Sequence, residues 1–352
     1  MMDAALSNRF RNMALLSACL VVTIHCSSHI GVTSALVRSV LEDGVCRIAV
    51  PFFFFASGYF LSKHVGETGW WKRALVSRLR TLAVPYLIFV SVYWLFRNSW
   101  YMVMNIRSGA NAFDGIDVSM PAILGIFGFN PFDYPAMAPL WYIRALLILI
   151  VLTPLLVRYK RVLLGRVGLL MLFIIYGLIA PWEHGGGVQN SHAHNFFRIC
   201  FALRGLFYMG VGFSFGLGEI NCTFKSKRIS FTCFFVGLCM MSLKVLTEMN
   251  GLRFYPYLGW VACPFLMFGT FNLMTAAEIP GWLSSCAFPV YLFHMLIVSS
   301  VTRVLGLLGY NQGLPVGIFA ACDVGIVLLS LAIVVLQRKL IPCLNGVLYG
   351  GR

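Results

Sequence analysis

The chain has 352 residues, of which 59% are hydrophobic and only 11% are charged, and its mean hydropathy is +0.83. A water-soluble core of this size cannot hide so many apolar side chains, so the composition excludes a soluble globular protein and indicates a polytopic membrane protein. The formal net charge of +15 would also suit a nucleic-acid-binding protein. The placement of the cations along the chain decides between the two classes.

Apolar runs of about 20 residues predict an all-α transmembrane helix bundle, because a helix of that length crosses the hydrocarbon core. We predict ten spans, at residues 12–31, 45–62, 81–97, 139–157, 163–181, 199–217, 229–246, 255–275, 282–302 and 315–336. Residues 98–138 form a long connection in which residues 120–129 are expected to lie as an interfacial or re-entrant helix. No linker or repeat divides the chain, so residues 1–352 are expected to form a single integral-membrane domain.

The basic residues predict the orientation of these spans. Most of the 27 Lys and Arg residues fall in alternate connecting segments, at residues 9–11, 63–80, 158–166, 225–228 and 338–352, whereas most of the acids fall in the other set. Because Lys and Arg accumulate in cytoplasmic loops, both termini are expected to be cytoplasmic. The surplus charge then reports topology, and no nucleic-acid partner is expected.

The ionisable side chains inside the predicted spans include His25, Arg47, Arg144, Arg204 and His294, which are opposed by little besides Asp323. Ionisable groups in a membrane are functional-site hypotheses by default. At a rise of about 1.5 Å per residue, His25 is roughly 20 Å and His294 roughly 18 Å from the cytoplasmic ends of their spans, and the arginines lie in the outer half. Such a cationic site is expected to bind an anion, and a guanidinium fork suits phosphate. The alternatives are arginines that snorkel or cap carbonyls, and histidines bonded to a neighbouring helix.

Four stretches, taken in order and together with a histidine in the first span, resemble the integral-membrane acyltransferase-3 family. They are RIAVPFFFFASGYFL at 47–61, RLRTLAVPYL at 78–87, PLWYIRAL at 139–146 and PVYLFH at 289–294. The resemblance extends over nearly the whole chain. Members of this family acylate surface carbohydrates.

The resemblance implies an O-acyltransferase of the cell inner (plasma) membrane, which takes an acyl group, commonly acetyl, from acetyl-coenzyme A or another acyl-coenzyme A supplied by the cytoplasm. The acceptor would be a hydroxyl of an extracytoplasmic or lipid-linked carbohydrate, so the partners are the coenzyme, a glycan and membrane lipids. His25 is the candidate catalytic residue, either as general base or as nucleophile. Arg47, Arg144, Arg204 and His294 would bind substrate phosphates or the oxyanion at the reacting carbonyl.

Three smaller features have other interpretations. Ser57 and Gly58 are expected to narrow the gap between the second span and a neighbour, with a direct substrate contact of Ser57 as the alternative. The sequence GFSFG at 212–216 matches a nucleophile elbow, but it ends an apolar helix and lacks the strand that this motif needs. His25 and His29 lie one turn apart without further metal ligands, so no metal is expected.

A second class of function also accounts for buried arginines. A transporter or flippase of an anionic glycolipid would place cations near the membrane midplane. Such carriers usually contain paired halves with broken helices, and the sequence has no internal repeat. The order and spacing of the four stretches therefore favour acyl transfer.

Overall fold

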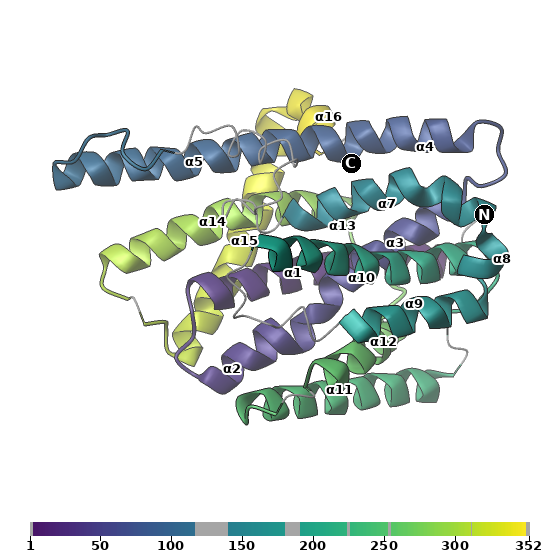
Figure 1. Cartoon of the computed structure of the whole chain (residues 1–352). Helices are drawn as coiled ribbons and strands as arrows, with labels where there is room; N and C mark the ends of the chain where they lie inside the picture. The colour runs from purple at the N-terminus through teal and green to yellow at the C-terminus, as the bar shows by residue number, and fades with distance from the viewer. Residues whose placement is uncertain are drawn as a thin grey trace.

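The computed structural model describes residues 3–116, 140–179, 191–223, 226–252, 255–310 and 312–349, and these residues form an all-helical bundle (Figure 1). The α-helices are α1 (Ala4–His29), α2 (Ala35–Ser39), α3 (Ala49–Ser62), α4 (Trp70–Arg78), α5 (Val84–Ser108), α7 (Trp141–Arg158), α8 (Lys160–Leu163), α9 (Arg166–Ile179), α10 (Ser191–Leu217), α11 (Lys227–Met249), α12 (Tyr255–Leu273), α13 (Gly281–Ser284), α14 (Ala287–Leu307), α15 (Val316–Leu340) and α16 (Asn345–Leu348). Shorter π and 3-10 turns are η1 (Val40–Gly44), η2 (Val45–Ile48), η3 (Leu79–Ala83) and η6 (Pro342–Leu344).

The prediction of an all-α membrane protein is confirmed. Within the described ranges, seven helical segments are long and apolar enough to cross a membrane, and α9 adds a shorter apolar helix. In the described residues, helix also occupies most of each of the ten segments predicted as spans. The number of crossings and the cytoplasmic location of the termini remain predictions.

The helix predicted at residues 81–97 is much longer in the structure. α4, η3 and α5 form one run of 39 residues from Trp70 to Ser108, about 58 Å at the usual rise, and α5 extends past its neighbours at one edge (Figure 1). The run ends where Gly109 adopts a left-handed conformation (φ 74°). Arg303 of α14 stabilises the extension, because its guanidinium lies 4.4 Å from the Phe96 ring and 4.7 Å from the Trp100 ring. The interfacial helix expected at residues 120–129 lies outside the described residues.

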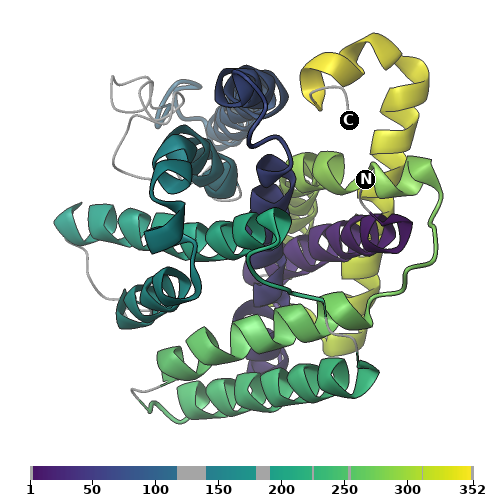
Figure 2. The same ribbon diagram turned by 90° about the vertical axis from the view of Figure 1, so that its right-hand side faces the viewer.

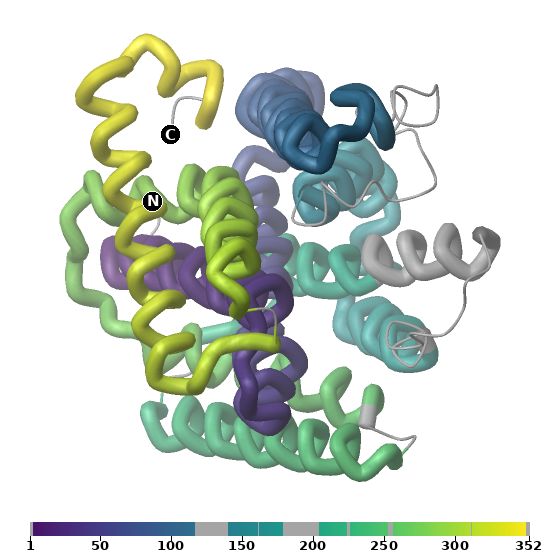
Figure 3. The backbone as a smooth tube through the Cα atoms, turned by 90° about the vertical axis from the view of Figure 1, so that its left-hand side faces the viewer, coloured from purple at the N-terminus to yellow at the C-terminus, as the bar shows by residue number. Residues whose placement is uncertain are grey.

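α1 occupies the centre of the bundle and packs against α3, α14 and α15 (Figures 2 and 3). At one end, Phe10 is buried, and its ring stacks on that of Tyr59 at 4.7 Å and lies tilted against that of Phe271 at 5.0 Å, measured between ring centroids. At the other end, Thr33 donates to the carbonyl of Leu314, so the loops after α1 and α14 are joined. These contacts fix the rotation and height of α1, and with them the place of His25.

Glycines bring α3 and α10 into backbone contact. A Cβ at Gly58 would lie 2.0 Å from the carbonyl oxygen of Met209, and one at Gly212 would lie 1.9 Å from that of Phe55. The expectation that Gly58 permits close helix approach is therefore confirmed. The GFSFG sequence has the same explanation, because Gly212 and Gly216 serve the helix contact rather than a nucleophile elbow.

Candidate functional site

Two histidines from different helices meet inside the bundle. The ring centroids of His25 on α1 and His294 on α14 are 5.2 Å apart, although 269 positions separate them in the chain. A direct N···N hydrogen bond between two imidazoles gives a centroid separation of about 5 Å, so the two rings lie at contact distance. His29 is one turn further along α1, with its ring 6.1 Å from that of His25.

The backbone defines the tautomer of His294. Its side chain is completely buried, and Nδ1 lies 2.7 Å from the carbonyl oxygen of Tyr291 and 3.3 Å from that of Val290. A carbonyl only accepts, so Nδ1 carries the proton and donates it, and Nε2 keeps its lone pair. Nε2 is buried without a hydrogen-bond partner in the part of the chain that the structure describes. His294 therefore offers one acceptor atom in the region of His25.

A cavity of about 520 Å³ lies near this pair, with Tyr291 in its wall and neither histidine among its described lining residues. Its deep end is lined by Phe53, Ser57, Tyr142 and Tyr291, and the Tyr291 ring lies 6.0 Å from that of His294. The Ser57 hydroxyl lies 3.4 Å from that of Tyr142, so two hydroxyls meet in a largely aromatic wall. Ser57 thus lines the cavity and is next to Gly58 in the chain. This position is compatible with a role in close helix approach and with a direct substrate contact.

The other end of the cavity is basic. Lys63, His64 and Arg78 line it, together with Ser284 and Ser285. Lys63 at the mouth and Phe53 at the deep end are ten positions apart along one helical stretch. At a rise of about 1.5 Å per residue, the two ends of the cavity are about 15 Å apart. This mouth lies on the side that the cation distribution predicts to be cytoplasmic.

The basic groups at the mouth are not equally engaged. Lys63 donates to the carbonyl of Gly216 at 3.1 Å, and His64 lies 3.4 Å from Glu67. Glu67 is paired chiefly with Arg73, whose hydrogen bond holds the pKa of that carboxyl below its usual range. Arg78 is half-buried and has no ion-pair or hydrogen-bond partner among the described residues. Its guanidinium is therefore the group best suited to receive an anion at the mouth.

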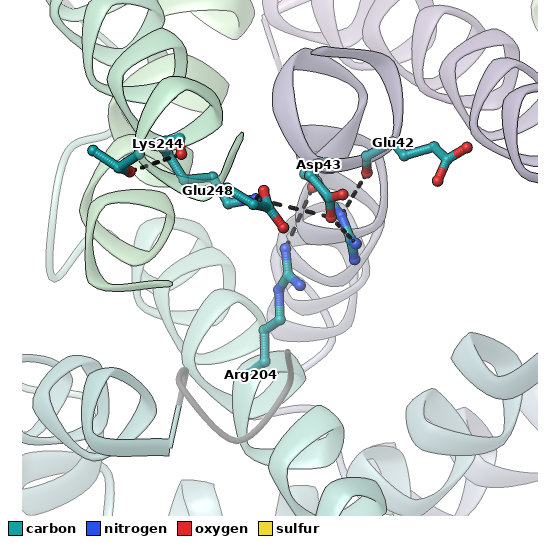
Figure 4. Close-up of polar contacts among 7 residues, drawn as sticks. Glu42, Asp43, Arg204, Lys244 and Glu248 are labelled. Carbon is teal, nitrogen blue, oxygen red and sulfur yellow. Dashed lines mark hydrogen bonds and ion pairs between the residues drawn. The ribbon is translucent and has the colours of Figure 1, made fainter. Parts of the chain in front are cut away.

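The second predicted span is a broken helix, and its break carries the charged cluster shown in Figure 4. π-helix η1 and 3-10 turn η2 interrupt the run between α2 and α3, so several carbonyls lose their usual helical donors. Arg47 donates through Nε to the carbonyl of Glu42 at 2.7 Å, and Arg204 of α10 donates to the carbonyl of Arg47 at 3.4 Å. Both guanidiniums thus satisfy the backbone at the break.

Acids and a lysine complete this cluster. Arg47 pairs with Asp43 at 2.5 Å, and Lys244 of α11 lies 3.8 Å from Asp43 and 2.9 Å from Glu248. Lys244 is only 2% exposed, and its pair with Asp43 joins α11 to the broken helix. A cavity of about 30 Å³ beside the cluster has room for little more than a water molecule. Phosphate binding by Arg47 and Arg204 stays a prediction that requires these contacts to be exchanged.

Arg144 occupies the first turn of α7, two residues after Tyr142. Because two residues along a helix point to nearly opposite sides, Tyr142 lines the cavity and Arg144 is not among its described lining residues. The structure thus brings His25 and His294 together, places Ser57 in the wall of the nearby cavity, and groups Arg47 with Arg204 at the helix break.

Sequence reasoning missed several residues of this site. Tyr142, Tyr291 and Arg78 all belong to the stretches that carry the family resemblance, so the signal was present. In the sequence, Lys63 and Arg78 serve only to predict the orientation of the spans. Lys244 was overlooked because a single Lys between Leu243 and Val245 barely interrupts an apolar run.

The described residues thus combine a helical membrane bundle, a cavity with a basic mouth and a histidine pair near its other end. In comparison with protein-family models, residues 13–335 match the acyltransferase-3 model, described as an acyltransferase domain. The chain therefore belongs to the acyltransferase-3 family and is a membrane acyltransferase. No curated protein and no solved structure matched the chain.

Proposed function

We propose that the protein transfers an acetyl group from acetyl-coenzyme A to a hydroxyl of an extracytoplasmic or lipid-linked carbohydrate, in the plasma membrane. The observation that supports this proposal best is a cavity with a basic mouth whose other end is lined by Tyr291, the ring beside the His25–His294 pair. The depth of about 15 Å suits an extended pantetheine arm. The phosphates of the coenzyme would then remain at Lys63, His64 and Arg78, and the thioester would lie at the deep end.

In this proposal His25 removes the proton from the acceptor hydroxyl while the hydroxyl oxygen attacks the thioester carbonyl. The carbon–sulfur bond breaks, and the coenzyme leaves as a thiol after taking up the proton. The unpartnered Nε2 of His294 would accept a hydrogen bond from one ring nitrogen of His25 during the reaction, which would keep the other nitrogen of His25 available as base. Attack by His25 itself on the thioester, with a transient acyl-imidazole, is the alternative use of the same nitrogen.

Labelled acetyl-coenzyme A distinguishes acyl transfer from transport of a glycolipid. The purified protein, reconstituted with a glycolipid extract, is given coenzyme carrying label in the acetyl group. Acyl transfer predicts that free thiol and labelled glycan appear together, and that His25→Gln prevents both. Movement of glycolipid across the bilayer with an intact thioester would support the carrier instead.

A further inference from the structure

A second basic cavity lies on the surface of the bundle. It is separate from the cavity of about 520 Å³ that we propose binds the acyl donor, which we call the donor cavity. It has a volume of about 620 Å³ and is lined by Lys72, Arg73, Val76, Ser77, Arg80, Thr81 and Gly346. All but Gly346 come from the run of α4 and η3, and Gly346 belongs to α16. Arg78 of the same run lines the donor cavity, so the helix separates the two basic cavities. We call the second one the α4 groove.

The α4 groove has a net excess of cations. Its described lining holds three basic side chains and two hydroxyls but no acid. Arg73 is already engaged, since it donates to Glu67 at 2.7 Å and to the carbonyl of Thr68 at 2.6 Å. Lys72 and Arg80 are exposed, and within the described ranges neither has an ion-pair or hydrogen-bond partner. They lie about 12 Å apart along the helix, with Ser77 between them.

The surroundings of the α4 groove are those of a membrane interface. α4 begins with Trp70 and Trp71, the residue type that concentrates at the level of lipid headgroups. Next to the cations, Val76 is 42% and Leu79 is 44% exposed, so an apolar strip adjoins the charged one. Figure 1 shows α4 at an outer edge of the bundle, where lipid can reach it. Cations beside an apolar strip at the cytoplasmic interface suit an acidic phospholipid.

We propose that the α4 groove binds the phosphate headgroup of an acidic phospholipid, held chiefly by Lys72 and Arg80, with the first part of the acyl chains against Val76 and Leu79. This site is independent of acyl transfer. The same phosphate chemistry would also be offered by a soluble nucleotide phosphate, so the test includes both sources.

Native mass spectrometry of the full-length protein provides the test. The protein is titrated with phosphatidylglycerol or phosphatidylcholine, and Lys72→Gln/Arg80→Gln is compared with Lys160→Gln/Arg166→Gln. The control pair removes two exposed cations from the same predicted side of the membrane, on α8 and α9. Loss of two headgroup contacts should weaken phosphatidylglycerol binding on the order of 30-fold, while phosphatidylcholine binding is unchanged. The control pair should bind as the unmodified protein does.

Two results would overturn the proposal. One is equal phosphatidylglycerol binding by both double variants, each checked for folding by its thermal midpoint. The other is displacement of the lipid by 3′,5′-adenosine diphosphate together with loss of nucleotide binding in Lys72→Gln/Arg80→Gln, which would assign the groove to a soluble phosphate. Charge reversal by Lys72→Glu/Arg80→Glu should reduce lipid binding further than the Gln pair does.

Discussion

At the scale of single residues, the site depends on what each ionisable side chain touches. The sequence was sufficient to select His25 and His294 as candidate site residues, because a titratable ring inside a membrane span is costly and often functional. It could not show that these two rings meet, since their contact depends on how α1 and α14 pack. Nor could the sequence distinguish Arg78, which lines the donor cavity, from nearby Arg73, which pairs with Glu67 outside that cavity.

Arg78 provides a prediction about donor binding. If its guanidinium holds a phosphate of the coenzyme, Arg78→Gln should raise the KM for acetyl-coenzyme A roughly 10- to 100-fold, because a hydrogen bond to a charged group contributes about 1.5–3 kcal/mol. The value of kcat should change little, since the contact is remote from the reacting carbon. Steady-state kinetics of Arg78→Gln beside Arg166→Gln, an exposed cation outside the cavity, checks this. A KM equal in both variants would remove Arg78 from the donor site.

Arg144 requires a different test, because the structure leaves it outside the cavity lining. If its planar fork binds phosphate or an oxyanion, Arg144→Lys should lose most activity although the charge is kept. A contact of that kind contributes on the order of 2–4 kcal/mol, or roughly 30- to 1000-fold in rate. Turnover is measured at equal membrane abundance. Near-normal turnover would indicate an arginine that only snorkels toward the outer headgroups.

At the scale of elements, the apolar runs predicted the helices, whereas the deviations come from contacts between helices. The composition of the chain does not predict the break between α2 and α3. The carbonyls at this break accept hydrogen bonds from Arg47 and Arg204, and the bond from Arg204 depends on how α10 packs in the fold. The extension of α5 is also a tertiary effect, since the Arg303 guanidinium lies over the ring of Trp100, which is beyond the predicted end at residue 97. The close approach of α3 and α10 was foreseen only at Gly58.

The contact between α3 and α10 predicts a difference between two glycine substitutions. Gly212→Leu should cost at least about 3 kcal/mol, because its Cβ would meet the carbonyl of Phe55 and a backbone carbonyl cannot rotate away. Gly325→Leu on α15 is the matched control, since a Cβ there meets nothing within 4 Å. The yield of monodisperse protein and the thermal midpoint in detergent report the effect. Equal behaviour of both variants would mean that the two helices do not pack this closely.

At the scale of the whole molecule, the proposed chemistry requires a fixed orientation. The donor cavity opens at Lys63 and Arg78, so a cytoplasmic coenzyme can enter only if that end faces inward. The charge distribution predicts this orientation. The hydroxyl of Thr23, two residues before His25, donates a hydrogen bond of 2.8 Å to the carboxylate of Asp323 on α15, so α1 is also held from this side.

Topology mapping tests the orientation directly. Single cysteines placed at residues 64–80 and 158–162 should be labelled only from the cytoplasm, and those at residues 105–117 and 184–194 only from outside. The native cysteines are first replaced, and labelling with a membrane-impermeant maleimide is compared before and after permeabilisation. Labelling of residues 72–80 from outside would place the basic mouth on the wrong side for the coenzyme.

The central claim is that His25 performs the chemistry with His294 beside it, and the acetylated product formed per unit of folded protein measures this most directly. His25→Gln should retain folding and membrane level while acyl transfer falls roughly 100-fold or more, because an amide cannot act as base or nucleophile at neutral pH. His294→Asn should keep the contact to the Tyr291 carbonyl and lose the Nε2 acceptor, so its rate should also fall, but by less. A near wild-type rate in His25→Gln would contradict the assignment, and His294 would become the candidate base.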